Sequence, residues 1–158
     1  MEDIVIIRPV EKEDLSRILY LCTLHAEFEK IPFRLDGQVS RLARDIFSHN
    51  PKLYCLVAVS QGEVIAYATY MKQYATWDAG EYMYLDCLFV LENFRSQGIG
   101  EKIMNQVKEH SAKLGCDLIQ WQTPDFNVKA MKFYRRIGAQ SKAKERFFLN
   151  LTSQNEKG

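Results

Sequence analysis

The sequence predicts an α/β fold with a mixed, mostly antiparallel central sheet, and three observations support that class. The chain has 158 residues, of which 47% are hydrophobic, and this suits one compact core. Two β-rich runs within 53–72 are separated by Gln61-Gly62-Glu63, which is typical of a hairpin. Strand-like runs at 81–90 and 117–122 flank a helical pattern over 96–114, so these two strands are expected to be joined by a crossover.

The N-terminal third is predicted as one strand followed by two helices. Ile4 to Ile7 is β-branched and is followed by Arg8-Pro9, which favours a first strand that ends at a residue unable to donate a backbone hydrogen bond. From Lys12 to about Glu29, apolar residues recur at the spacing of one helical face. Asp36 is the expected N-cap of a second helix, which Asn50-Pro51 ends.

The C-terminal third is predicted as a helix and a last strand. Asn127 can cap a helix that contains Tyr134 and ends at Gly138. Residues 146–151 are expected to form the final strand. We therefore expect one domain over 1–151, with 152–158 as a polar C-terminal tail.

Charge and cysteine usage exclude several classes of protein. The 21 Lys+Arg and 20 Asp+Glu leave a formal charge of +1, which argues against nucleic-acid binding through a general basic field. The longest uncharged stretch, 53–62, is too short to cross a bilayer, and the acidic start is unlike a leader peptide. The four cysteines and three histidines show no metal-ligand spacing. We expect a cytoplasmic protein with reduced thiols, no metal and no membrane or nucleic-acid partner.

The most informative segment, 84–100, combines an apolar strand, a short loop and two glycines at a helix start. Such a loop brings backbone N–H groups close to an anion, and a pyrophosphate suits it best. A P-loop is excluded because Gly98-Ile-Gly100-Glu-Lys102 lacks its four-residue interval. The dinucleotide fingerprint is excluded because position 103 is isoleucine. A plain turn at the two glycines is the alternative.

Arg95-Ser-Gln-Gly98-Ile-Gly100 matches the R/Q-x-x-G-x-G/A signature of the GNAT superfamily of N-acetyltransferases. The chain resembles that family in the order of its elements as well, including Asn127 and Tyr134 on the helix that ends at Gly138. Three segments resemble the spermidine/spermine acetyltransferases and their diamine- or thialysine-acetylating relatives, namely 26–30, 84–90 and 132–139. The resemblance implies a sheet splayed between two strands, about four flanking helices, acetyl-CoA as co-substrate and a homodimer.

The resemblance also implies a set of cofactor contacts that extends from the pantetheine arm to the thiol end. The arm would pair with backbone groups of Leu88, Phe89 and Val90. The pyrophosphate loop would comprise Arg95, Ser96, Gln97, Gly98, Ile99, Gly100 and Glu101. The splayed neighbouring strand and the following helix would contribute Gln120, Trp121, Gln122, Asn127, Val128, Lys129 and Ala130. Asn127 as a mere helix cap is the alternative.

Two residues are predicted to handle protons. An alkylamine has a pKa of about 10.4 and must lose a proton before it attacks a thioester. Asp86, a carboxylate among apolar residues of the cofactor strand, is the candidate base, acting directly or through water. The polyamine enzymes carry glutamate at the matching place. Tyr134 would stand beside the sulfur as the acid. Ion pairing of Asp86 and core packing of Tyr134 are the alternatives.

The acceptor is predicted from local charge. Residues 73–94 carry Asp78, Glu81, Asp86 and Glu92 without Lys or Arg, and aromatic residues are interleaved. We expect the acceptor to contact Glu27, Glu29, Trp77, Asp78, Tyr84 and Asp86. The last strand departs from the polyamine enzymes, because only Glu145 can stand for their acidic residue beside tryptophan. A solvated acidic strand face is the alternative.

The sequence therefore predicts direct acetyl transfer to a primary amine in a small cationic diamine, polyamine or lysine-like molecule. Two other functions remain open at this point. The acceptor can be a protein N-terminus or lysine side chain, or the chain can be a regulatory domain that binds acyl-CoA without catalysis.

Overall fold

The computed structural model describes residues 4–152, so the predicted polar tail, 152–158, lies almost entirely outside the described residues. The chain divides into two compact units, Met1–Asn127 and Val128–Gly158. We describe each unit by itself. That the two act as one domain stays a prediction.

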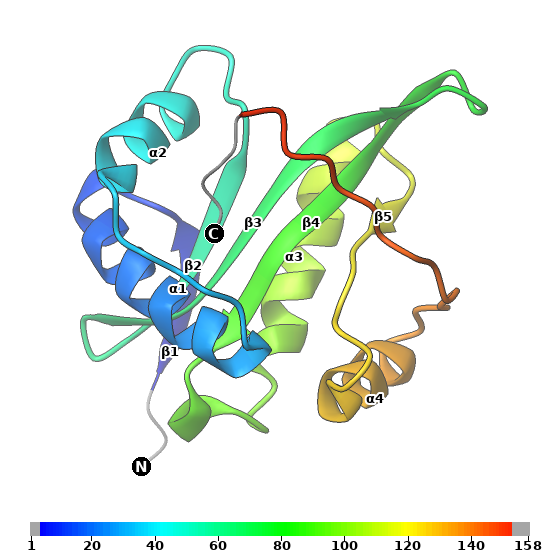
Figure 1. Cartoon of the computed structure of the whole chain (residues 1–158). Coiled ribbons are helices and arrows are strands. Elements are labelled where there is room, and N and C mark those ends of the chain that lie inside the picture. The colour runs from blue at the N-terminus through cyan, green and yellow to red at the C-terminus, as the bar shows by residue number, and fades with distance from the viewer. Residues whose placement is uncertain (1–3, 153–158) are drawn as a thin grey trace. The chain divides into compact units, whose positions relative to one another are not determined.

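The first unit is built on a five-stranded sheet in the order β1-β2-β3-β4-β5 (Figure 1). Its strands are β1 (Val5–Pro9), β2 (Tyr54–Ser60), β3 (Glu63–Ala75), β4 (Gly80–Val90) and β5 (Ile119–Gln120). Neighbouring strands run antiparallel from β1 to β4, whereas β5 runs parallel to β4. The prediction of a mixed, mostly antiparallel sheet is confirmed.

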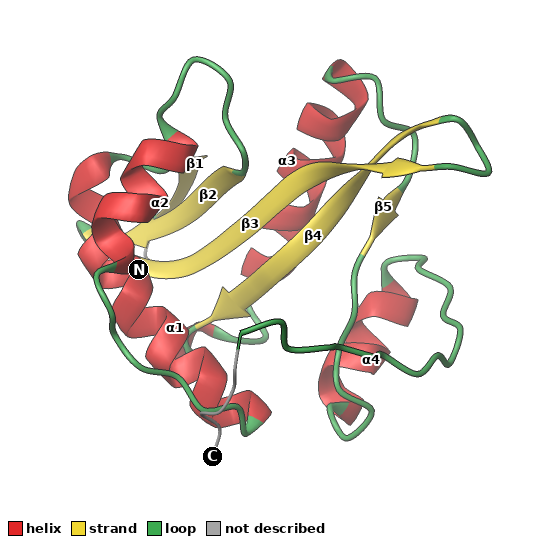
Figure 2. Cartoon of the chain, turned by 45° about the horizontal axis from the view of Figure 1, so that its top comes forward, coloured by secondary structure: helices red, strands yellow, loops and turns green. Residues whose placement is uncertain are grey.

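Helices cover both faces of this sheet. In the first unit they are α1 (Leu15–Glu29), α2 (Gln38–Ile46) and α3 (Ile99–Lys113), with short 3-10 turns η1 (Lys12–Asp14) and η2 (Glu92–Phe94). Figures 1 and 2 show α1 and α2 on one face and α3 on the other. The second unit contains α4 (Val128–Arg136). No helix among residues 4–152 is both long and apolar enough to cross a membrane.

Two tyrosines of β3 mark the two faces, because side chains alternate along a strand. The hydroxyl of Tyr67 lies 3.1 Å from Nδ1 of His25 on α1. The hydroxyl of Tyr70, three positions later, lies 2.8 Å from Nδ1 of His110 on α3. Both tyrosines are only 1% exposed. The central strand is therefore buried on both sides, and each face attaches to its helix through a polar contact as well as apolar packing.

Three sequence predictions about elements are wrong. Gly37, with φ +70°, is the N-cap of α2 in place of Asp36, because the chain enters that helix through a left-handed residue. Only Ile119–Gln120 of the strand expected at 117–122 forms. Residues 146–151 are not a strand in the described part of the second unit. Alternating apolar residues form a strand only where a neighbour accepts their backbone hydrogen bonds, and no described strand does so here.

Candidate active site

The sheet opens between β4 and β5. These strands pair only at Met83 with Ile119 and at Tyr84 with Gln120. Farther along β4, Leu88 to Val90 pair with β3 on one edge alone within the described sheet. Every second peptide group on the other edge points toward the opening, where an extended ligand can add as a strand does. The predicted splay is confirmed, and Leu88, Phe89 and Val90 lie beyond it.

Asp86 occupies a β-bulge in the same strand. Thr69 faces Cys87 and Tyr70 faces Leu85, which leaves Asp86 without a partner residue across the strands. The bulge exposes the Asp86 carboxylate, so the expectation of apolar surroundings is wrong. Cys87 donates its thiol to Oδ2 of Asp86 at 3.6 Å. Burial and the charge of Asp86 raise the pKa of Cys87 to about 12, so this thiol stays neutral and is a poor nucleophile.

The glycine loop after β4 leads into the N-terminus of α3. Ser96 and Gly98 adopt φ of +66° and +78°, and Gly98 is the N-cap. A Cβ built on Gly98 meets no atom within 4 Å, so the space in front of this turn is open. No side chain caps the helix, which leaves the N–H groups of its first turn available to an anion. These features fit the predicted pyrophosphate.

Arg95 turns back toward the strand. Its Nε donates to the carbonyl oxygen of Val90 at 2.8 Å. The guanidinium carbon lies 5.1 Å from the ring centre of Phe28 and 5.3 Å from that of Phe89. Arg95 therefore fixes the start of the loop and ties it to the end of α1.

The strand beyond the opening is tied to β4 by a side-chain bond. Gln122 donates its Nε2 to the hydroxyl of Tyr84 at 2.8 Å. Asn127 is 9% exposed, and its Nδ2 donates to Oγ1 of Thr123 at 3.2 Å. Gln120 is exposed and Trp121 is half-buried. Their predicted contacts with the pantetheine arm stay predictions.

Two predicted acceptor residues, Trp77 and Asp78, lie at the hairpin tip between β3 and β4 and not near Asp86. Trp77 is fully exposed there, and Ala79 donates to the carbonyl of Thr76 to close the turn. Asp78 lies in the turn before β4, and six strand positions separate Gly80 from Asp86, about 20 Å at the usual rise per residue. Figure 1 shows the tip projecting beyond the sheet. A small amine cannot contact both carboxylates of one chain.

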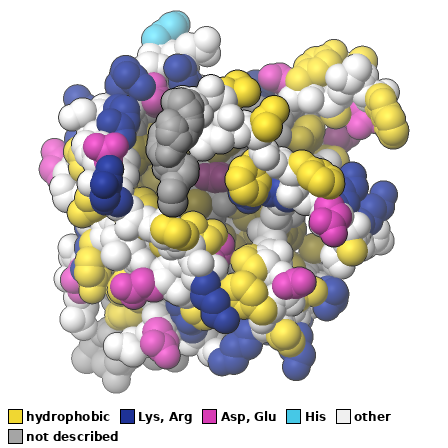
Figure 3. All heavy atoms as spheres, viewed as in Figure 1, with side chains coloured by type: hydrophobic (Ala, Val, Ile, Leu, Met, Phe, Trp, Pro, Cys, Tyr) yellow, Lys and Arg dark blue, Asp and Glu magenta, His cyan; other side chains and the backbone are white. Residues whose placement is uncertain are grey.

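The acidic stretch is also weaker than its sequence suggests. Lys72 on β3 lies 3.5 Å from Glu81 on β4, so one of the four negative charges is paired by a residue just outside the stretch. Acidic and basic side chains are interspersed over the face in Figure 3. Charge counting along the chain missed a partner that strand pairing supplies.

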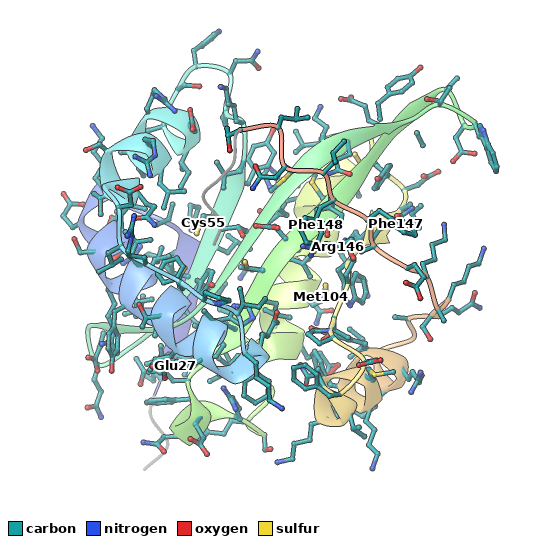
Figure 4. All side chains as sticks on the ribbon, viewed as in Figure 1. Glu27, Cys55, Met104, Arg146, Phe147 and Phe148 are labelled. Carbon is teal, nitrogen blue, oxygen red and sulfur yellow. The ribbon has the colours of Figure 1, made fainter. Side chains whose placement is uncertain are left out.

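The end of α1 carries the two remaining predicted acceptor carboxylates. Glu27 is exposed (Figure 4). Glu29 is half-buried, and its Oε2 lies 2.8 Å from Nε2 of His25. Sequence reasoning missed His25 and its contact with Tyr67. The signal was the i, i+4 spacing of His25 and Glu29, which puts both side chains on the same side of a helix.

The second unit holds the predicted thiol-end residues other than Asn127. Val128, Lys129 and Ala130 form the first turn of α4, and Tyr134 follows one turn later. The carbonyl of Tyr134 accepts the N–H of Ala139, and its ring centre lies 5.4 Å from that of Phe133. The contacts of these residues with acetyl-CoA stay predictions.

The open edge of β4 and the glycine loop that follows it suit an extended ligand with an anionic group. Residues 14–139 match the family model "Acetyltransferase (GNAT) family". The chain belongs to this family, and it is an N-acetyltransferase by class.

Relatives of known name are similar along nearly the whole chain. The thialysine N-epsilon-acetyltransferase of Mus musculus is 33% identical over 158 residues, covering 95% of this chain and 92% of that protein. The Bos taurus protein of the same name is 35% identical over 86% of this chain and 84% of its own. The D-amino-acid N-acetyltransferase of Saccharomyces cerevisiae is 24% identical over 87% of this chain and 86% of its own.

Solved structures agree with the fold. An aminoglycoside N-acetyltransferase in complex with CoA has a TM-score of 0.80 at 18% identity, covering 96% of this chain and 98% of its own. A metagenomic aminoglycoside acetyltransferase has a TM-score of 0.78 at 19% identity, covering 94% of this chain and 97% of its own. At these identities the likeness concerns the fold alone.

Proposed function

We propose that this protein transfers the acetyl group of acetyl-CoA to a primary amine of a small cationic molecule, such as a diamine, a polyamine or a lysine-like amino acid. One observation carries the proposal. An exposed carboxylate, Asp86, sits in a bulge of the strand whose open edge leads to the uncapped N-terminus of α3. An amine site and a donor site therefore share β4.

The donor assignment rests on the loop and the open strand edge. Backbone N–H groups at the start of α3 favour the pyrophosphate, and the edge of Leu88 to Val90 offers peptide groups to the pantetheine arm. The aminoglycoside acetyltransferase of the same fold holds CoA. In this proposal Asn127 and the first turn of α4 contact the thiol end.

Direct attack is the chemistry that these residues favour. Burial raises the pKa of Cys55 and of Cys87 to about 12, so neither thiol supplies a nucleophile at neutral pH. Asp86 takes a proton from the ammonium, directly or through water, and the neutral nitrogen attacks the thioester carbon. A nitrogen–carbon bond forms as the carbon–sulfur bond breaks. Tyr134 gives a proton to the leaving sulfur, and the second proton that the nitrogen loses as the amide forms restores the tyrosine hydroxyl.

The acceptor class is supported by the chain's own carboxylates and by its relatives. Asp86 accepts from Cys87, and Glu29 is hydrogen-bonded to His25; Cys87 packs against the core cluster that contains Tyr67, the partner of His25. Relatives are named for transfer to thialysine and to D-amino acids. Both are small molecules with an amine.

A homodimer, implied by the family resemblance, is also part of the proposal. Light scattering of the purified protein tests it.

A panel of amines with acetyl-CoA tests the function, with release of free thiol as the signal. We expect the best turnover with cationic diamines and lysine-like amino acids, and poor turnover with anionic amines. If a peptide N-terminus is acetylated faster than every small amine, the acceptor is a protein and not a small molecule. Binding of acetyl-CoA with no turnover on any amine would favour a regulatory domain instead.

A further inference from the structure

A chain of polar contacts runs from the core to the end of α1. The thiol of Cys22 lies 3.3 Å from the Tyr67 hydroxyl, and that hydroxyl lies 3.1 Å from Nδ1 of His25. Nε2 of His25 lies 2.8 Å from Oε2 of Glu29. These polar contacts thus link the buried strand β3 to a carboxylate at the protein surface.

The positions of the protons follow from what each group can donate. Cys22 donates its thiol hydrogen to the Tyr67 oxygen. The single hydroxyl hydrogen of Tyr67 has Nδ1 of His25, 3.1 Å away, as its acceptor when that nitrogen carries no hydrogen. Burial raises the pKa of Tyr67, so the hydroxyl keeps its hydrogen. In that arrangement the hydrogen of the imidazole is on Nε2, which donates to Oε2 of Glu29.

Packing holds the imidazole in this position. The His25 ring stacks on Phe89, with centres 4.9 Å apart and planes 23° from parallel. Its side chain is 16% exposed and that of Glu29 is 23% exposed. A neutral donor fixes the carboxylate without cancelling its negative charge. Within residues 4–152, no hydrogen bond occupies the other oxygen, Oε1.

The other end of the same cluster reaches Asp86. Cys87 packs against the core cluster that contains Tyr67, and its thiol donates to Oδ2 of Asp86. Tyr67 therefore belongs to a cluster that carries His25 and Glu29 on one side and Cys87 and Asp86 on the other. A diamine offers two ammonium groups to two such carboxylates, whereas a monoamine offers one.

We propose that His25 is a positioning residue for acceptor selection: its Nε2–H holds the Glu29 carboxylate toward the distal ammonium of a diamine, and Tyr67 keeps the imidazole in the tautomer that this requires. The inference rests on the proposed amine acetyltransferase function. Asp86 serves the reacting ammonium, and Glu29 serves the second one.

Steady-state kinetics with a matched pair of acceptors tests this role. One acceptor is a linear diamine and the other is the monoamine of the same chain length. The variant His25→Leu removes the donor, and His25→Gln supplies an N–H near the position of Nε2. We expect His25→Leu to raise the KM for the diamine roughly tenfold, as loss of a hydrogen bond to a charged group does, with kcat kept. The KM for the monoamine should stay within about twofold, and His25→Gln should restore most of the preference.

Two further variants locate the effect. Glu29→Gln should remove the same preference, and the pair His25→Leu with Glu29→Gln should cost no more than either change alone, because both break one interaction. The melting temperature and the affinity for acetyl-CoA serve as controls for folding. A rise in both acceptor KM values together would show a general packing role and overturn the proposal.

Nuclear magnetic resonance of ¹⁵N-labelled histidine reads the tautomer without any acceptor. We expect the Nε2–H form of His25 in the wild type and a mixture of tautomers in Tyr67→Phe. An Nδ1–H form in the wild type would refute the positioning mechanism even if amines are acetylated. Failure of the proposed function is recognised separately, as absence of transfer to diamine and monoamine alike.

Discussion

The guanidinium of Arg95 lies 5.1 Å from the ring centre of Phe28. Arg95 begins the glycine loop, and Phe28 is on the last turn of α1, next to Glu29. The same arginine donates to the carbonyl of Val90, the last residue of β4. One side chain therefore joins the predicted pyrophosphate loop, the end of β4 and the end of α1.

Replacing Arg95 by leucine should weaken acetyl-CoA binding by roughly tenfold. The change removes a charged donor to Val90 and the cation–π contacts, each worth about 1 kcal/mol, and lets the loop move. Calorimetric titration with acetyl-CoA measures the affinity of the variant. Arg44→Leu is the control, because Arg44 pairs with Asp45 on the exposed side of α2. Unchanged affinity in a folded Arg95→Leu protein would mean that the loop holds its shape without the arginine.

Gly98→Glu should abolish acetyl-CoA binding. The added side chain enters the open space before α3, brings a negative charge to the anion site and strains a residue at φ +78°. Gly98→Ala separates these causes, because alanine adds the strain without the charge and should bind with intermediate affinity. Both affinities come from titration of the folded variants. Equal binding by Gly98→Glu and the wild type would remove this loop from the donor site.

Most of the fold follows from local sequence signals. The β2–β3 hairpin and the helices α1 and α3 carry their own apolar periodicity and turn residues, so they form where expected. The segment 146–151 has the same alternation and is not a strand, because a strand also needs a neighbour. Asp36 has the chemistry of an N-cap, but the path of the chain places Gly37 there. What failed is what depends on contacts distant in sequence.

The candidate site divides in the same way. The glycine loop and the strand before it form a continuous motif, so the sequence alone points to them. The bulge at Asp86 is a register shift between two strands, and no local pattern predicts it. The separation of Asp78 from Asp86 and the pairing of Lys72 with Glu81 also depend on how β3 and β4 are aligned. Tyr134 stays a sequence prediction.

Tyr134→Phe should lower kcat by roughly 100-fold, the usual loss when a positioned acid is removed. The phenyl ring keeps the contact with Phe133, so folding and acetyl-CoA affinity should stay near wild type. Turnover of the best acceptor under saturating acetyl-CoA is the measurement. Phe133→Tyr gives a matched change on the neighbouring residue, without loss of the proposed acid. Wild-type turnover in Tyr134→Phe would assign the proton to water or to another group.

Asp86→Asn should raise the acceptor KM and lower kcat together. In the proposed mechanism the carboxylate both attracts the ammonium and takes its proton, and an amide would do neither. The rise of kcat/KM with pH should move to higher pH, since the ammonium must then lose its proton without a base. Asp78→Asn is the control, because Asp78 lies at the hairpin tip, and its kinetic constants should stay within about twofold. An equal loss in both variants would contradict the assignment of the acceptor to the bulge.

The ion pair at the start of α1 should make stability depend on pH in a defined direction. Arg8 donates Nη1 and Nη2 to the two oxygens of Asp14 at 2.7 and 3.1 Å, and the N–H of Glu11 donates to Oδ2 at 2.8 Å. The hydrogen bond from Arg8 holds the pKa of Asp14 below its ordinary value, although burial opposes it. Because the folded pKa is the lower one, this stabilisation is present at neutral pH and is lost as the pH falls through the folded pKa.

Asp14→Asn should therefore reduce the free energy of unfolding at pH 7 by about 1–2 kcal/mol, the range for a largely buried charged hydrogen bond. The deficit should shrink at pH 3, where the wild type begins to lose the same interaction. Urea unfolding at both pH values measures it. Asp45→Asn on the exposed pair with Arg44 should leave the midpoint nearly unchanged, since exposed pairs contribute little. A deficit of the same size at pH 3 and pH 7 would show that Asp14 stabilises the turn by packing and backbone capping, because those contributions do not depend on its charge.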